Sequence, residues 1–277
     1  MTVFRPRDLS DALGFLAEAP AVLLAGGTDV FPALGDRPAP ARVLDLTALP
    51  ELRGIARDGD RWRIGAGVTW AELLRADLPA AFDGLKAAGR QVGSVQIQTT
   101  GTLAGNICNA SPAADGVPVL LALDASVELA STSGRRVVAL GDFVTGVRKT
   151  DLRPGEVVTA ILVPHLRGDL RSGFGKLGAR AYLVISIASL AVVLRFERGA
   201  LAEARIAVGA CSPVPQRLPA LERDLVGAPE GALGALVRVD HFDGLAPIDD
   251  VRASAAYRRD AVATLARRML DRCGARP

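Results

Sequence analysis

Thr99-Thr-Gly-Thr-Leu-Ala-Gly-Asn-Ile-Cys-Asn-Ala-Ser-Pro-Ala-Ala-Asp115 is the most informative stretch of this chain. It holds both asparagines of the 277-residue sequence, Asn106 and Asn109. A lone asparagine is typical of a tight turn, because it tolerates a positive φ and its side chain bonds to its own backbone. Two asparagines within four residues, preceded by threonines and glycines, instead indicate a loop whose polar atoms face a ligand. Asp115 either contacts that ligand or stabilises the first turn of a helix, which we expect to begin at Ser111-Pro112.

A second candidate loop lies near the N-terminus. Gly26-Gly27-Thr28-Asp29 directly follows a buried-strand pattern at Ala21–Ala25. Two glycines let the backbone turn sharply, so that successive N–H groups point at one anion. Alone, this pattern fits a plain strand–turn–helix equally well, with Asp29 as the helix cap. Two loops that each combine glycine with hydroxyl side chains can together enclose a pyrophosphate from both sides.

Composition excludes several classes of protein. Hydrophobic residues make up 49% and charged residues 23%, which is typical of a globular protein. The net charge of +3 is spread without long basic runs, so we expect no nucleic-acid partner. No apolar run reaches the ~18 residues of a membrane span, and the N-terminus lacks the apolar region of a signal peptide. A cytoplasmic location is therefore expected.

The residues available for catalysis and metal binding are few. The three cysteines, Cys108, Cys211 and Cys273, are far apart, and only His165 and His241 offer imidazole. The usual spacings of zinc and iron–sulfur ligands are missing, so we predict no metal site. We also assign no catalytic residue, because the sequence offers binding groups and little acid–base chemistry. Any redox work would then depend on an organic cofactor.

The pattern of apolar residues predicts an α+β protein in two parts. Short strands and helices alternate up to a polar segment at 164–171, which we take as the domain boundary. Three long β-like runs follow, at 172–177, 185–196 and 202–211, and indicate an antiparallel meander. Helical patterns at 219–225, 230–237 and 252–270 would cover it. In the last helix, we expect Arg258, Arg259, Arg267 and Arg268 on the outer face.

Several separated stretches, in order along the chain, resemble the flavin-binding medium subunit of molybdenum hydroxylases, the family of xanthine dehydrogenase and carbon monoxide dehydrogenase. The likeness covers nearly the whole length. Its most specific part is Thr102-Leu-Ala-Gly-Asn106 with Ala110-Ser-Pro-Ala-Ala-Asp115. The other matching stretches are Leu24-Ala-Gly-Gly-Thr-Asp-Val30, Gly173-Phe-Gly-Lys-Leu-Gly-Ala-Arg180, Val208-Gly-Ala-Cys-Ser-Pro-Val-Pro-Gln-Arg217 and Ser254-Ala-Ala-Tyr-Arg-Arg259.

The resemblance implies a fold and a set of FAD-binding residues. Residues 1–170 would form a two-part FAD-binding domain of the vanillyl-alcohol-oxidase type. Residues 171–277 would form an α+β domain with a three-stranded antiparallel sheet and helices. The implied cofactor-binding residues are Leu24, Ala25, Gly26, Gly27, Thr28, Asp29, Val30, Thr102, Leu103, Ala104, Gly105, Asn106, Asp115 and Lys176.

Each of these groups has an implied place on the cofactor. Ala25 to Asp29 would wrap the pyrophosphate, and Thr102 to Asn106 would close on it from the other side. Asp115 would hold the ribityl or ribose part. Lys176 would approach the flavin ring, and its being one of only three lysines beside thirty arginines favours a specific role. Tyr182 would cover the flavin face or, alternatively, pack as a strand aromatic in the core.

The implied function is an FAD-binding electron-transfer subunit. Its partners would be a large subunit with a molybdenum cofactor and a small subunit with [2Fe–2S] clusters, and the electrons would pass to NAD, oxygen or another acceptor. Thr28-Asp29 stands where carbon monoxide dehydrogenases tend to carry His-Ser, which favours the xanthine- and aromatic-substrate branches. Two alternatives remain: an autonomous flavin oxidase with its own small substrate, and a structural subunit that has lost its flavin.

Overall fold

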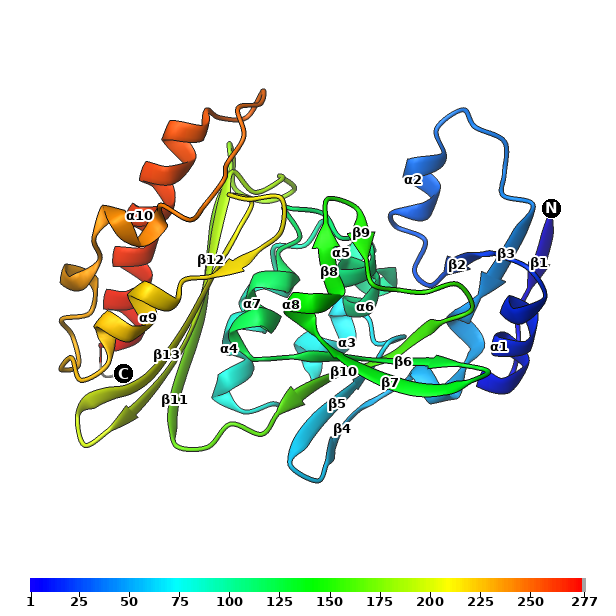
Figure 1. Cartoon of the computed structure of the whole chain (residues 1–277), viewed down its shortest axis with the longest axis horizontal. Coiled ribbons are helices and arrows are strands. Elements are labelled where there is room, and N and C mark those ends of the chain that lie inside the picture. The colour runs from blue at the N-terminus through cyan, green and yellow to red at the C-terminus, as the bar shows by residue number, and fades with distance from the viewer. Residues whose placement is uncertain (276–277) are drawn as a thin grey trace.

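The computed structural model describes residues 1–275, and its three larger sheets are arranged along the long axis (Figure 1). The N-terminal sheet is parallel, with the strand order β1-β3-β2. Helix α1 (Leu9–Glu18) packs on it through its buried apolar face, and its N-cap Asp8 accepts a bond from the Asp11 amide at 2.9 Å. The strands are β1 (Thr2–Phe4), β2 (Val22–Leu24) and β3 (Arg42–Asp45).

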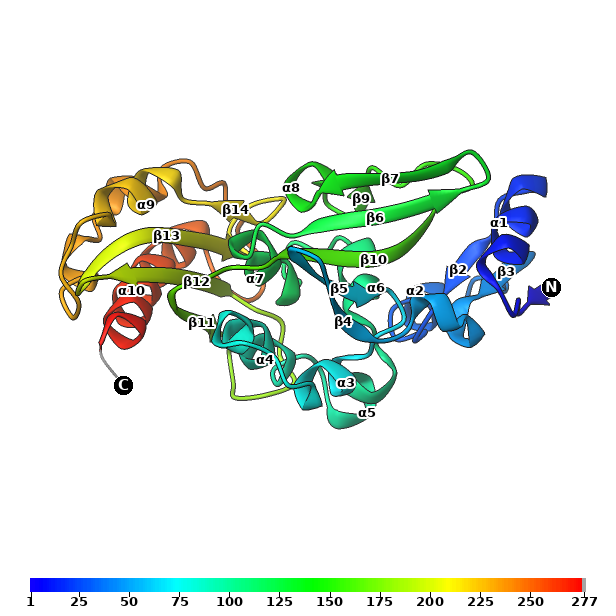
Figure 2. The ribbon, with the colours of Figure 1, turned by 90° about the horizontal axis from the view of Figure 1, so that it is seen from below.

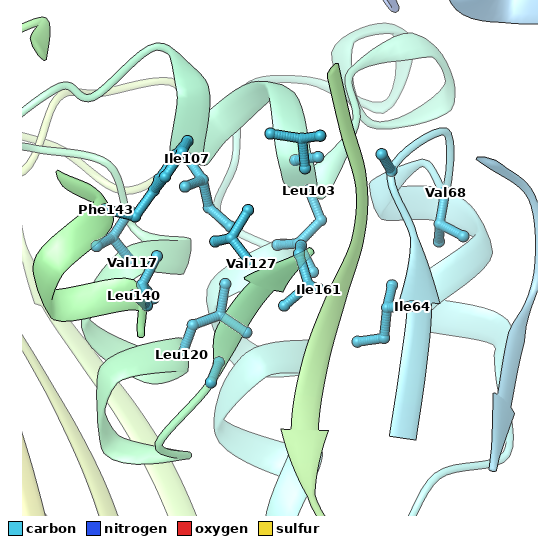
Figure 3. Packing of buried hydrophobic residues seen from close by; sticks show 14 of the residues in the cluster. Ile64, Val68, Leu103, Ile107, Val117, Leu120, Val127, Leu140, Phe143 and Ile161 are labelled. Carbon is cyan, nitrogen blue, oxygen red and sulfur yellow. The ribbon is translucent and has the colours of Figure 1, made fainter. Parts of the chain in front are cut away.

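The central sheet has five antiparallel strands in the order β4-β5-β10-β6-β7. Its middle strand β10 is buried from Val157 to Val163, and helices cover one face of the sheet (Figure 2). Figure 3 shows aliphatic side chains of these helices meeting those of the strands. The strands are β4 (Ile55–Asp58), β5 (Arg61–Gly65), β6 (Ser126–Ser131), β7 (Gly134–Ala139) and β10 (Val157–Pro164), with a separate small hairpin of β8 (Val144–Gly146) and β9 (Lys149–Thr150).

The helices between these strands are short. Several begin at a capping side chain: Thr69 and Glu72 form a reciprocal capping box at the start of α3, and Ser94 caps α5. The helices of this part of the chain are α2 (Val30–Leu34), α3 (Trp70–Arg75), α4 (Asp83–Gly89), α5 (Val95–Thr100), α6 (Leu103–Cys108), α7 (Gly116–Ala122) and α8 (Leu140–Phe143), with 3₁₀ turns at Leu46–Ala48, Pro50–Leu52 and Ala80–Phe82.

The expected binding loop at 99–115 contains the end of α5 and all of α6, and its remaining residues form turns and irregular backbone. The hydroxyl of Thr102 accepts a bond from the Gly105 amide at 2.9 Å and so caps α6. Leu103 and Ile107, one helical turn apart, are buried in the core (Figure 3). The prediction of a helix from Ser111-Pro112 is also wrong, because α7 begins at Gly116. Capping and burial of one face therefore make Leu103–Cys108 a helix, although the composition of the stretch is that of a loop.

The C-terminal sheet is antiparallel and has four strands, in the order β11-β12-β13-β14, which corrects the expected three. The strand that the sequence analysis missed, β14, has only two residues. So short a strand shows no alternation of apolar and polar residues, and its pairing with β13 depends on the preceding turn. The strands are β11 (Asp169–Leu177), β12 (Ala188–Glu197), β13 (Ala200–Gly209) and β14 (Gln216–Arg217).

Both faces of this sheet are covered. Leu190, Val192 and Leu194 of β12 belong to the core shared with α9 (Pro219–Leu225) and α10 (Ala255–Gly274). Ala191 and Val193 instead face the central unit. Two-sided burial explains why β12 is a nearly continuous apolar run. The predicted boundary at 170/171 falls within β11 and stays a prediction, and residues 276–277 of the predicted second domain lie outside the described residues.

Two further expectations for the C-terminal part are wrong. The helix expected at 230–237 is a 3₁₀ turn at Gly234–Leu236, followed by another at Val239–Phe242. Arg258 is not on the outer face of α10 but only 3% exposed. Its guanidinium donates to the main-chain oxygens of Ile187 at 2.5 Å and Ala210 at 3.2 Å, which compensates for the loss of water.

Leu120→Ala should lower the free energy of unfolding by roughly 2–5 kcal/mol, because Leu120 is fully buried and the smaller side chain leaves a cavity. The matched control Leu236→Ala removes a side chain that is 38% exposed and should cost less than about 1 kcal/mol. Urea unfolding of both variants measures the difference. Equal losses would contradict the described core.

Candidate functional site

A cavity of about 990 Å³ lies where the N-terminal and central units meet. Its walls come from segments far apart in the sequence. The Gly26–Asp29 loop and α2 contribute one wall, and the end of α5 together with α6 contributes another. Arg53, Trp70 and Arg148 add side chains from other elements. The two candidate loops therefore face one common space.

The two glycines of the first loop are required by its geometry. A Cβ added at Gly26 would overlap the carbonyl oxygen of Thr100, which belongs to α5. Gly27 has φ +70°, and a Cβ there would lie 2.6 Å from the ring of Phe31. Glycine is thus needed at one position for close approach and at the other for a left-handed backbone. Through Gly26 the two walls of the cavity touch directly.

Asn106, in the second wall, has a side-chain acceptor that forms no hydrogen bond with the described part of the chain. Its side-chain oxygen is buried and has no hydrogen-bond partner among the described residues. An added Cβ at Gly116 would lie 2.9 Å from the same oxygen, so glycine is needed beside it. A buried amide without a partner costs free energy, unless a ligand supplies the missing donor. Asn106 also lines the cavity, as a cofactor-binding residue must.

Ten of the fourteen residues implied by the resemblance line the cavity. The other four lie elsewhere: Leu24 ends β2, Leu103 is fully buried in the core, and Asp115 and Lys176 form a separate buried pair. The ten lining residues are Ala25, Gly26, Gly27, Thr28, Asp29, Val30, Thr102, Ala104, Gly105 and Asn106.

Asp115 and Lys176 form an ion pair between the central unit and the C-terminal sheet. The ammonium of Lys176 lies 2.6 Å from Oδ2 of Asp115, and each side chain is 6% exposed. The hydroxyl of Ser186 donates to Oδ1 of Asp115 at 2.6 Å. Burial raises the pKa of the Asp115 carboxyl, whereas Lys176 and Ser186 act in the opposite direction. This network joins α7, β11 and the segment before β12.

Two of the cavity-lining residues outside the implied set, Asn109 and Arg148, form hydrogen bonds at the first loop. Asn109 donates from Nδ2 to Oδ1 of Asp29 at 2.6 Å. Arg148, on the turn between β8 and β9, donates to the side-chain oxygen of Asn109 and, at 3.2 Å, to its main-chain oxygen. The scarcity of asparagine had already marked Asn109 as unusual, whereas nothing in the sequence distinguishes Arg148 among thirty arginines.

The residues weighed as possible bases or flavin covers lie as follows. His241 is buried beside Asp224, with 3.0 Å between Nε2 and Oδ2, and neither it nor His165 lines the cavity. Cys108 does line it. Tyr182 is 75% exposed, so the alternative of a strand aromatic in the core is wrong. It lies in the loop that carries Ile185, which reaches the cavity.

Comparison with known proteins agrees with this geometry. Residues 1–166 match the family described as the FAD binding domain in molybdopterin dehydrogenase. Residues 176–273 match the CO dehydrogenase flavoprotein C-terminal domain. The chain belongs to the family of FAD-binding medium subunits of molybdenum hydroxylases. FAD is therefore its cofactor, and the protein is a flavoprotein subunit of a dehydrogenase complex.

Relatives in this FAD-subunit family match over nearly the whole chain. The medium subunit of nicotine 6-hydroxylase from Paenarthrobacter nicotinovorans is 32% identical, over 98% of this chain and 96% of the relative. The medium chain of carbon monoxide dehydrogenase from Afipia carboxidovorans is 31% identical, with the same coverage. A structure of CO dehydrogenase from Oligotropha carboxidovorans superimposes with a TM-score of 0.92 at 28% identity, covering 100% of this chain and 98% of that one.

The residues of the cavity fit FAD. Gly26 and Gly27 form a cradle that a Cβ would fill, and Asn106 supplies a buried acceptor without a protein partner. The charged residues that line it are Asp29, Arg53 and Arg148. Within the described residues, no helix is both long and apolar enough to cross a lipid bilayer.

Lys176→Met should destabilise the FAD subunit by roughly 3–5 kcal/mol near pH 8, because it leaves the buried Asp115 carboxylate without its cation. Burial raises the pKa of Asp115, and in this variant the Lys176 cation that counteracts the rise is missing. The neutral form of Asp115 is stable at low pH, and stability is lost as the pH rises through that pKa. Urea unfolding at pH 5 and pH 8, with equal added FAD, should show the smaller loss at pH 5.

Two controls accompany the Lys176→Met measurement. Lys149→Met removes an exposed lysine and should change stability little. Combining Lys176→Met with Asp115→Asn removes both charges and should recover part of the loss. A loss in Lys176→Met that is the same at both pH values would show that the pair is not ionised as described.

Proposed function

We propose that this FAD subunit is an electron-transfer subunit, which receives electrons from iron–sulfur clusters of a partner and passes them through FAD to an acceptor. The observation that carries the proposal is the chemistry of the cavity wall. Among the described residues that line it, there is no histidine, lysine, glutamate or tyrosine. The wall can hold and orient a cofactor, and it offers few groups that could take a proton from a substrate.

The proposed contacts with FAD follow the two walls. Ala25 to Asp29 would hold the pyrophosphate from one side, and Thr102 to Asn106 from the other. Val30 would contact the cofactor from the cavity wall, whereas Leu24 and Leu103 would support these segments from behind. We also propose that the fold of this FAD-binding region is of the vanillyl-alcohol-oxidase type. Its support is the enclosure of a single cavity by two glycine-containing segments from different units.

Asp115 and Lys176 remain proposed residues on the ribityl and flavin-ring side. Their pair lies at the interface with the C-terminal sheet. Asp115 directly follows the cavity-lining Ala114, and its partner Ser186 directly follows the cavity-lining Ile185. A cation near the ring would favour reduced, anionic flavin. Tyr182, exposed on the same loop as Ile185, is the residue that we propose to cover the flavin face.

We propose two partner subunits, one carrying the molybdenum cofactor and the other [2Fe–2S] clusters. The support is that the matched relatives are medium subunits and medium chains of multi-subunit enzymes. NAD remains a possible acceptor, as do oxygen and other oxidants. Thr28-Asp29 at the first loop favours the branches that act on xanthine and aromatic compounds. A cytoplasmic location is part of the same proposal.

The alternative is an autonomous flavin oxidase that acts on its own small substrate. Such an enzyme would need a base beside the flavin, and the lining residues offer only Asp29 and Cys108 for that purpose. The autonomous oxidase is therefore the second candidate. Stopped-flow reduction distinguishes the two, because only an oxidase is reduced directly by a small substrate when no partner subunit is present.

The purified chain should show the visible absorption bands of oxidised flavin, and acid precipitation should release the flavin into the supernatant. This result is expected because the cavity holds FAD through noncovalent contacts alone. A spectrum recorded before and after precipitation measures it. A protein that stays colourless after incubation with FAD would contradict the proposed function.

Asn106→Ala should weaken FAD binding by roughly 1–3 kcal/mol, because the buried side-chain oxygen is proposed to accept a hydrogen bond from the cofactor. Unfolding of the flavin-free protein should change little, since the lost oxygen has no protein partner. Flavin titration followed by fluorescence gives the dissociation constant. Gln96→Ala removes an exposed amide from α5 and serves as the control. Equal affinity of the two variants would remove Asn106 from the site.

A further inference from the structure

The segment that forms one wall of the cavity is weakly attached to the rest of the protein. Residues 27–40 contain no buried side chain, and α2 stands away from the three sheets (Figure 1). Several of its residues nevertheless line the cavity, including Thr28, Asp29 and Ala33. A segment with so little buried surface opens at a low cost in free energy. Something else must hold this wall against α6.

Hydrogen bonds from this segment to other parts of the described chain are nearly absent. Those of Phe31, Ala33 and Arg37 stay within the segment. The bond from Asn109 to Asp29, across 80 residues of sequence, is the one that reaches outside it. Asn109 ends α6, so this bond connects the loosely packed wall directly to the opposite wall.

The side chain of Asn109 suits this position because it is an amide. Its Nδ2 donates to the carboxylate of Asp29, and its Oδ1 accepts from the guanidinium of Arg148. A carboxylate could only accept, and an ammonium could only donate. Arg148 is itself fixed through its backbone, whose N–H donates to Ala110 at 2.9 Å. The two side-chain bonds connect the three residues in a continuous tie. Both involve a charged partner, and such hydrogen bonds are stronger than those between neutral groups.

The tie lies at the rim of the cavity and not at its base. Asp29 and Arg148 are exposed, Asn109 is half-buried, and all three line the cavity. We propose that Asp29, Asn109 and Arg148 form a latch that holds the 27–40 segment over the cavity and limits the rates at which FAD enters and leaves. This inference rests on the proposed function only in naming FAD as the molecule that passes.

The latch should act on rates more than on affinity. Opening of the wall precedes both entry and release, so loss of the latch raises both rate constants by a similar factor and leaves their ratio nearly unchanged. A residue that contacts FAD directly behaves differently, because its loss raises the release rate alone and the dissociation constant with it. The two rate constants together therefore distinguish a latch from a binding contact.

Asn109→Ala and Asn109→Leu test the latch in the full chain. Both remove the two side-chain hydrogen bonds, and leucine keeps about the same volume. Each variant should raise the association and release rates of FAD about tenfold, with the dissociation constant changed less than about threefold. Stopped-flow flavin fluorescence gives the association rate, and the change in flavin fluorescence after rapid dilution of the complex gives the release rate. Arg148→Ala should shift both rates the same way but less, because the bond to Asp29 remains.

Lys149→Ala is the matched control for charge. It removes one positive charge from the residue next to Arg148, and Lys149 does not line the cavity. Its rates should equal those of the unchanged protein. A rise in the release rate and the dissociation constant together, or unchanged rates in the Asn109 variants, would overturn the latch.

Hydrogen exchange gives a measurement that needs no flavin. Within Gly27–Leu34, the hydrogen-bonded amides of Phe31 and Ala33 should exchange about tenfold faster in Asn109→Ala, whereas those of α4, far from the latch, should not change. If the unchanged protein binds no FAD, the proposed function fails, but exchange still decides whether this tie holds the wall. Unchanged exchange at Gly27–Leu34 would overturn the latch even if FAD binds.

Discussion

Lys176 and Asp115 meet in the interior, 2.6 Å apart, where the central unit packs on the C-terminal sheet. Neither charge is stable there alone, because removal from water costs several kcal/mol for each ion. The pair therefore requires that the start of α7 and the end of β11 stay next to each other. Ser186 adds a third element to the same point through its bond to Asp115. The orientation of the two halves, and of the segment that reaches the cavity, depends on this network.

The cavity itself is held by a different kind of constraint. Gly26 lies so close to the Thr100 carbonyl that no side chain fits between them, which fixes the distance between the two walls at their base. At the rim the walls are joined by hydrogen bonds among Asp29, Asn109 and Arg148. Steric contact is permanent, whereas hydrogen bonds at an exposed rim break and re-form. The FAD subunit thus combines a rigid base with a rim that can open.

Much of the fold could be predicted from local patterns. The helix at Leu9–Glu18 has its cap and apolar stripe in sequence, and the long strands β12 and β13 are rich in alanine, valine, leucine and isoleucine. The misses share a physical cause, which is dependence on distant partners. Strand β14 exists because β13 offers it an edge, and Arg258 is buried because two distant main-chain oxygens accept from it. α6 is helical because Leu103 and Ile107 find a core to enter.

The order and types of residues along the chain specify the chemistry of this FAD subunit. The sequence supplied the glycines, hydroxyls and two asparagines of the two candidate segments, their order along the chain and the scarcity of metal ligands. Which of these groups lie together depends on how the sheets and helices pack. The tertiary structure placed ten of the implied residues on the cavity, paired Asp115 with Lys176, and brought Asn109 between Asp29 and Arg148. The reason is that residue types and spacing fix local conformation, whereas contacts between residues 61 or 80 positions apart depend on how the sheets and helices pack.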